Sequence, residues 1–231
     1  MHKRVAGIVA GFLLASSLLF SPSIGRAAGG AHIVDDSEVE TPGTCHLETW
    51  VTRFIPGDGY ANFEPACTPA SVPWLELGLA YQHYWDQTVG APLLGPQGKI
   101  TIQSDTNGVG VGIGFNAAVN LTTGYVNLAS VIGLVTIPIG KSLRVNINAG
   151  WSYLDSDAPN AFFWGGQLEV DVSRDVSLMM EAFGRHPGLI GNQLGLRYTP
   201  NNGRFDFDFL VGTTFDDVTT QFITMGVTIR F

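Results

Sequence analysis

Apolar and polar residues alternate with a period of two through most of the chain from residue 46 onward. In the last segment, every second residue from Ile223 to Phe231 is apolar, and threonine, glycine and arginine stand between them. Segments 203–213 and 142–153 repeat the pattern. This period is that of a β-strand with two unlike faces. The chain therefore predicts an all-β fold whose strands, about ten residues long, can cross a bilayer when tilted.

Two-faced strands also build soluble β-sandwiches, which remain the alternative. A membrane barrel is favoured because one face of each strand is almost purely apolar, while the other is polar and carries charges. The chain also ends on an aromatic residue in an outward apolar row, Phe231. Connections are expected to alternate in length, as periplasmic turns and outer loops do. The short ones are 139–142, 173–175 and 200–203, and the longer ones are 86–98, 154–161, 186–190 and 214–220.

Counting back from Phe231 predicts an antiparallel up-and-down transmembrane β-barrel of about twelve strands. Ten strands follow residue 67, and residues 46–67 add one hairpin; ten strands is the alternative count. Bacterial single-chain barrels have an even number of strands. The expected strands are 46–54, 60–67, 74–85, 99–105, 108–119, 125–138, 142–153, 162–173, 176–185, 191–199, 203–213 and 221–231.

The residues before the barrel divide into two predicted parts. Residues 1–27 combine a basic start, an apolar stretch and the sequence Gly25-Arg26-Ala27, which together predict a secretory signal peptide cleaved after Ala27. An uncleaved membrane anchor is the alternative. Residues 28–44 are acidic and show neither the period of two of a strand nor the period of 3.6 of a helix. We therefore interpret them as a mobile periplasmic arm, and residues 45–231 as the barrel. The alternative is that this arm folds into the barrel lumen.

Composition narrows the function classes. The chain carries 12 basic and 20 acidic residues, a net charge of −8, and only 14% of its residues are charged. An acidic protein lacks the basic face that nucleic-acid binding needs. The expected location is the bacterial outer membrane. The expected partners are outer-membrane lipids, lipopolysaccharide and the assembly machinery, with Phe231 as the assembly signal.

Cys45 and Cys67 are the only cysteines, and they stand at mirror positions about residue 56. The two ends of the first hairpin therefore bring them together, and the periplasm is oxidising, so we predict a disulfide. A metal site is not expected, because His46 is the only further ligand nearby.

Chemistry in this chain is expected on the lumen face. The predicted inward charged residues, candidates for setting solute selectivity, are Glu76, Arg144, Glu169, Asp171, Glu181, Arg185, Arg197, Arg204, Asp206, Asp208 and Arg230. Facing arginines and carboxylates filter polar solutes in an open pore. The same residues could instead form salt bridges that close the lumen. Twelve strands lie between filled eight-stranded barrels and open porins, so both readings stand.

Catalytic and nucleotide-binding motifs are absent from the sequence: there is no H-E-x-x-H, G-x-S-x-G or P-loop pattern. No cofactor is expected, and a hydrolase on the barrel wall is the enzymatic alternative. Glycines alternate from Gly108 to Gly114, which we interpret as the lumen face of a strand. They leave room for bulky neighbours or an inserted segment.

Residues 32–67, with their two cysteines, and the terminal Phe231 resemble proteobacterial outer-membrane transporters of the "meta-pathway of phenol degradation" type. The resemblance implies a β-barrel that admits small hydrophobic or aromatic compounds, without catalytic residues to transfer. The leading hypothesis is therefore a twelve-stranded channel for passive passage of small molecules. A structural barrel closed by salt bridges is its first rival.

Overall fold

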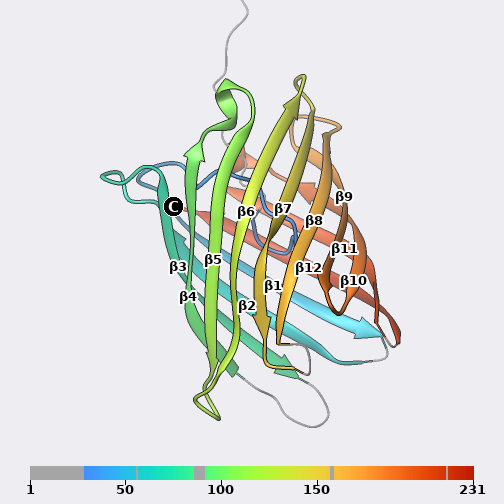
Figure 1. Cartoon of the computed structure of the whole chain (residues 1–231). Helices are drawn as coiled ribbons and strands as arrows, with labels where there is room; N and C mark the ends of the chain where they lie inside the picture. Colours follow the sequence, from blue (N-terminus) through green and yellow to red (C-terminus); the bar gives the residue numbers. More distant parts are fainter. Residues whose placement is uncertain (1–28, 56, 86–91, 157–158, 217) are drawn as a thin grey trace, which may run out of the picture.

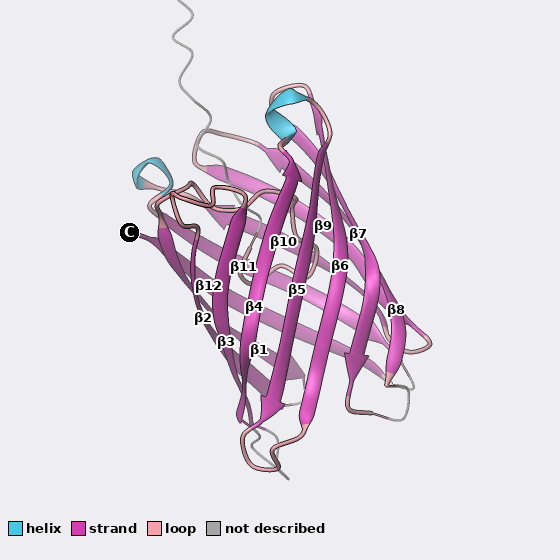
Figure 2. Cartoon of the chain, turned by 60° about the vertical axis from the view of Figure 1, so that its left-hand side comes forward, coloured by secondary structure: helices cyan, strands magenta, loops and turns pink. Residues whose placement is uncertain are grey.

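The computed structural model describes residues 29–55, 57–85, 92–156, 159–216 and 218–231. The described strands form a closed antiparallel barrel in which each strand pairs with the next and β12 pairs with β1 (Figures 1 and 2). The strands are β1 (Cys45–Ile55), β2 (Gly59–Cys67), β3 (Leu75–Trp85), β4 (Pro92–Gln103), β5 (Gly110–Asn120), β6 (Val126–Ile139), β7 (Leu143–Leu154), β8 (Asn160–Asp171), β9 (Val176–His186), β10 (Ile190–Tyr198), β11 (Phe205–Phe215) and β12 (Thr219–Arg230). Two short 3₁₀ helices, η1 (Asp105–Asn107) and η2 (Asn201–Gly203), lie in connections.

The predicted fold, strand order and count of twelve are confirmed. The main error is β4, which begins at Pro92 and not at residue 99. Prolines and glycines make this stretch look like a loop. The missing side chain of Gly95 is required, because a Cβ atom there would lie 1.8 Å from the carbonyl oxygen of Ala117 on β5. Residues 104–105 lie outside β4, in the turn that contains η1.

The expected alternation of short and long connections is wrong. We call the barrel end where β1 begins and β12 ends the terminal mouth. Its connections include 68–74, 104–109 and 199–204, while 121–125 and 187–189 lie at the opposite end. Much of the expected long loop 86–98 belongs to β4. Backbone hydrogen bonds extend strands past the point where the alternation of side chains ends. Loop lengths inferred from the alternation alone are therefore wrong.

The outer face of the barrel is apolar. In β10 exposure alternates at every residue, with Leu194, Leu196 and Tyr198 exposed and Gln193 and Arg197 buried. Exposed large apolar side chains recur on strands all round the barrel. A continuous apolar belt of this kind suits contact with lipid hydrocarbon. Among the described residues, no helix is long and apolar enough to cross a membrane.

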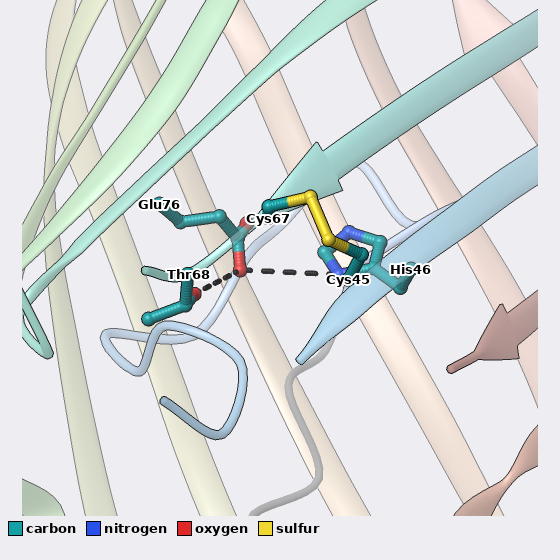
Figure 3. Close-up of a disulfide and its surroundings, with 5 residues drawn as sticks. All are labelled: Cys45, His46, Cys67, Thr68 and Glu76. Carbon is teal, nitrogen blue, oxygen red and sulfur yellow. Dashed lines mark hydrogen bonds and ion pairs between the residues drawn. A yellow bond between two sulfur atoms is a disulfide. The ribbon is translucent and has the colours of Figure 1, made fainter. Parts of the chain in front are cut away.

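The predicted disulfide is confirmed. Cys45 and Cys67 are direct partners in the β1–β2 ladder, with their Cα atoms 4.0 Å apart. The bond closes the first hairpin at the terminal mouth (Figure 3). It fixes the point where residues 29–44 pass into β1.

Replacing Cys45 and Cys67 together by serine should lower the free energy of unfolding by about 3 kcal/mol, because the bond restricts the unfolded chain. The bond spans a sequence separation of 22 residues. Unfolding in urea, in detergent micelles, measures the change. Reductant should destabilise the wild-type protein and leave the double serine variant unaffected; equal stability of the two proteins without reductant would contradict the prediction.

Candidate functional site: a lumen closed by the N-terminal segment

Residues 29–44, which we call the lumen segment, lie inside the barrel (blue in Figure 1). The interpretation of these residues as a mobile solvated arm is therefore wrong, and the alternative placement in the lumen holds. Val34, Asp36 and Ser37 have no solvent-exposed surface. The segment turns deep in the lumen, because its ends at Gly29 and Gly43 both lie nearer the terminal mouth than Val34 does. The predicted signal peptide lies outside the described residues and stays a prediction.

A ladder of polar side chains crosses the lumen wall from β6 to β10. Its members are direct neighbours on successive strands: Thr136, Asn146, Gln167, Glu181 and Gln193. Each is hydrogen bonded to the next at 2.7–3.1 Å, and all five are buried. A buried polar group costs free energy unless it is hydrogen bonded, so this ladder gives the wall one defined set of donors and acceptors.

The lumen segment docks on this ladder through its backbone. Glu181 accepts hydrogen bonds from the amides of Ile33 and Val34 at 3.0 and 3.1 Å. At the other end of the ladder, the hydroxyl of Thr136 accepts from the amide of Ser37 at 2.9 Å. The glycines of β5 make room for this contact, as expected. A Cβ atom on Gly110 would lie 2.2 Å from the hydroxyl oxygen of Ser37.

His32 is enclosed by two carboxylates of the wall. Its Nδ1 atom bonds Glu181, and its Nε2 atom lies 3.5 Å from a carboxylate oxygen of Asp208. Burial alone would lower the pKa of His32, but the charges of Glu181 and Asp208 outweigh it and raise the pKa to about 9. The imidazolium form is therefore the docked form at neutral pH.

Ion pairs fix the rest of the segment. Lys99 on β4 lies 2.8 Å from Asp35 and 3.5 Å from Asp36. Arg230 on β12 pairs with Glu40 of the segment and, at 2.8 Å, with Asp206 on β11. Asp35, Asp36 and Glu40, which look like part of a solvated tail in the sequence, are thus counter-ions of buried wall cations.

The tip of the segment meets an apolar cluster. Val34 packs against Phe183 and Phe222, and Phe54, Phe163 and Leu189 surround them. Phe183 and Phe222 are 3% and 5% exposed, so side chains fill the lumen around the tip of the segment. The segment is therefore held by polar contacts along its sides and by apolar packing at its tip.

Two cavities lie on either side of the segment. One, of about 390 Å³, lies within the lumen between the segment and a wall formed mainly by β1–β6, with Asn148 and Ser152 of β7 and Phe163 of β8. The other, of about 1200 Å³, opens at the terminal mouth among the turns and Glu38, Val39 and Arg230. They share no lining residue, and buried Asp36 and Ser37 line neither. The segment thus separates the mouth from the inner lumen.

The structure brings most predicted lumen residues into contact with one another or with the segment. Arg197 bonds Asp208 through two nitrogen atoms at 2.7 and 2.8 Å, and Arg144 bonds Glu169 at 2.7 Å. The other contacts join Arg230 to Asp206, Glu76 to the amide of Glu40, Asp171 to Ser177, and Arg185 to Ser152. Their role in solute selectivity stays a prediction.

The prediction that Arg204 faces the lumen is wrong. It lies before β11 in the turn after η2, is exposed, and places its guanidinium 5.6 Å from the ring centroid of Phe205. The alternation seen in β11 does not extend to it because the turn interrupts the strand. Sequence reasoning also missed Lys99, Glu48 and Glu64. Glu48 and Glu64 are mirror positions about residue 56, so the argument that pairs the cysteines could have paired them.

Comparison with known proteins places the chain in a family. The family model described as "Uncharacterised conserved protein UCP029691" matches residues 16–231. The chain belongs to this family. The resemblance to the phenol-degradation group is not supported by this match. No curated protein matches the chain.

Several solved structures share the fold of this UCP029691 member. The COG4313 outer membrane channel from Pseudomonas putida F1 has a TM-score of 0.62 at 8% identity, covering 85% of this chain and 98% of that one. The KdgM porin in complex with disordered oligogalacturonate gives 0.61 at 10%, covering 80% and 99%. The NanC porin gives 0.58 at 9%, covering 79% and 98%. At these identities the likeness shows the fold alone.

Replacing Arg230 by alanine should destabilise the barrel by about 3 kcal/mol, since Asp206 and Glu40 then lose a buried counter-ion. Replacing Arg204 by alanine removes the same charge from an exposed turn and should change stability by less than about 1 kcal/mol. Unfolding free energies of the two variants give the comparison. Similar losses in both would contradict the assignment of Arg230 to the lumen and of Arg204 to the surface.

The raised pKa of His32 makes docking of the segment pH-dependent. A raised pKa contributes stability that is fully present below the ordinary value of 6.5 and is lost as pH rises through about 9. His32→Gln should lack this contribution. The difference in thermal midpoint between wild type and variant should therefore shrink across that pH window. A difference that stays constant would show that His32 is not charged when docked.

Proposed function

We propose that this protein is a bacterial outer-membrane channel for small molecules, closed at rest by its own lumen segment. The apolar outer belt supports a position in a membrane, and the polar wall supports a water-accessible interior. The observation that carries the proposal is the pair of cavities separated by residues 29–44. The segment occupies a passage that otherwise runs from the terminal mouth into the lumen.

A structural barrel with a permanently closed lumen is the second candidate. The pairs Arg197–Asp208 and Arg144–Glu169 and the ladder through Glu181 favour it, because they fill the wall from β6 to β11. They leave the cavity beside β1–β6 unfilled, which supports the channel. A hydrolase has less support. His32 is held by carboxylates of Glu181 and Asp208 and not by a serine.

The surroundings of the barrel follow from its surface and its C-terminus. We infer contact with outer-membrane lipids and lipopolysaccharide along the apolar belt. Phe231 is 71% exposed, and its backbone bonds Cys45 at the terminal mouth. Its aromatic ring is thus accessible, which supports its proposed role as the signal read by the assembly machinery.

The solute class differs from that implied by the sequence resemblance. Small hydrophobic or aromatic compounds would need an apolar path. Apolar side chains such as Leu93 form much of the wall of the inner cavity, but carboxylates and amides also line it, among them Glu48, Glu64, Asn62 and Gln97. These groups support passage of small polar solutes.

Weakening the hold of the segment should open the channel. Asp36→Asn with Glu40→Gln removes one of the two carboxylate charges that face Lys99 and the one segment carboxylate that faces Arg230, while the full chain is kept. In planar bilayers the wild-type barrel should be closed or open only briefly, and the double variant should conduct steadily. Deletion of residues 29–43 should give the same conducting state.

Asp216→Asn is a control variant, because it replaces one aspartate by asparagine at an exposed loop position away from the segment. It should behave as wild type. Folded barrels are recognised by heat-modifiable migration on gels. A folded segment-free barrel that does not conduct would establish the structural barrel and reject the channel.

A further inference from the structure

The inner cavity is bounded by the lumen segment on one side and by β1–β6 on the other. Four carboxylates line it: Asp35, Glu48, Glu64 and Glu76. Lys99 is the one lysine or arginine among its described lining residues. The ion pairs of Lys99 within the described residues are with Asp35 and Asp36, and it forms none with Glu48, Glu64 or Glu76.

Glu48 and Glu64 face each other directly across the β1–β2 ladder. His46 lines the cavity near the terminal mouth, and its ring lies 3.8 Å from Glu48 and 4.0 Å from Glu76 (Figure 3 shows His46 and Glu76). Glu64 accepts a hydrogen bond from Asn62 at 3.2 Å. Within the described residues, Glu64 has no ion pair with a lysine, arginine or histidine. Like charges opposite each other in a sheet destabilise it unless something lies between them.

Asn62 supplies a second and independent sign of a missing partner. It is 7% exposed and lines the same cavity, and its amide nitrogen donates a hydrogen bond to Glu64. Its carbonyl oxygen Oδ1 is buried without any hydrogen-bond donor. A buried acceptor left unpaired costs free energy. Within the described residues, Glu48 and Glu64 thus face each other without an ion pair to a lysine or arginine, and Oδ1 of Asn62 beside them lacks a donor.

The rest of the cavity indicates what kind of cation would fit. A volume of about 390 Å³ far exceeds a bare ion, and the described residues contain no cluster of three or more metal-ligating side chains. The amide of Gln82 and the apolar side chain of Leu93 line the part farther from the terminal mouth. They suit the uncharged portion of an organic molecule.

We propose that this cavity binds small organic cations, with an ammonium or guanidinium group between Glu48 and Glu64 and a short uncharged portion toward Leu93. The N–H groups of such a cation would donate to both carboxylates and to Oδ1 of Asn62. The proposal rests on the proposed channel in that it names the class of solute the lumen selects. Binding itself requires no conduction.

Calorimetric titration of the full mature barrel in detergent micelles tests the site with four probes. Butylammonium and guanidinium should bind, while butanol and butyrate should not. Glu64→Gln removes one carboxylate and keeps the shape, and it should weaken butylammonium binding at least tenfold. Asp216→Asn, with the same change of charge at an exposed loop, should bind as wild type. Fluorescence of Trp50, which lines the cavity, reports the same event independently.

Equal binding of butanol and butylammonium would overturn the proposal, because it would show an apolar pocket without charge recognition. Binding that survives Glu64→Gln, or no binding of either cation, would overturn it as well. The wild-type probe series remains decisive if the variant does not fold. Amine binding by a barrel that never conducts would reject the channel and retain the binding site. Conduction without amine binding would reject the binding site and retain the channel.

Discussion

The arrangement of the lumen depends on one constraint: polar groups buried there must have hydrogen-bond or ion-pair partners. Glu181 shows this most clearly, because its two oxygens accept from Gln167, Gln193, His32 and the amides of Ile33 and Val34. The wall alone cannot satisfy this carboxylate. The lumen segment completes its hydrogen bonds, and in return the wall orders a peptide that has no secondary structure of its own.

The lumen therefore has two unlike sides. On the wall from β6 to β12, charges are matched: Arg144 with Glu169, Arg197 with Asp208, and Arg230 with Asp206 and Glu40. On the wall from β1 to β5, carboxylates outnumber cations and a cavity remains. Lys99 and Glu76 on this second side also hold the segment, whereas Glu48 and Glu64 face each other without an ion pair to a lysine or arginine among the described residues. This division reconciles the two opposed readings of the sequence, a plug and a pore.

The disulfide and the ion pairs of the segment act at the same place. Cys45 follows the segment directly, and Glu76 beside it accepts both the amide of Glu40 and the hydroxyl of Thr68 (Figure 3). The hairpin of β1 and β2 is thereby a fixed anchor at the terminal mouth.

By itself, the sequence determined the count of twelve strands, the face of most strand residues and the cysteine pair, because period-two alternation and mirror positions in a hairpin are local properties. The tertiary structure alone decided where residues 29–44 lie, which cations they neutralise and which carboxylates remain unpaired. Those contacts join residues as distant as His32 and Glu181, 149 positions apart, and they exist only because the barrel closes around the segment. Arg204 and β4 were misjudged for a related reason: backbone pairing with neighbouring strands sets where a strand starts and ends, and side-chain alternation does not record it.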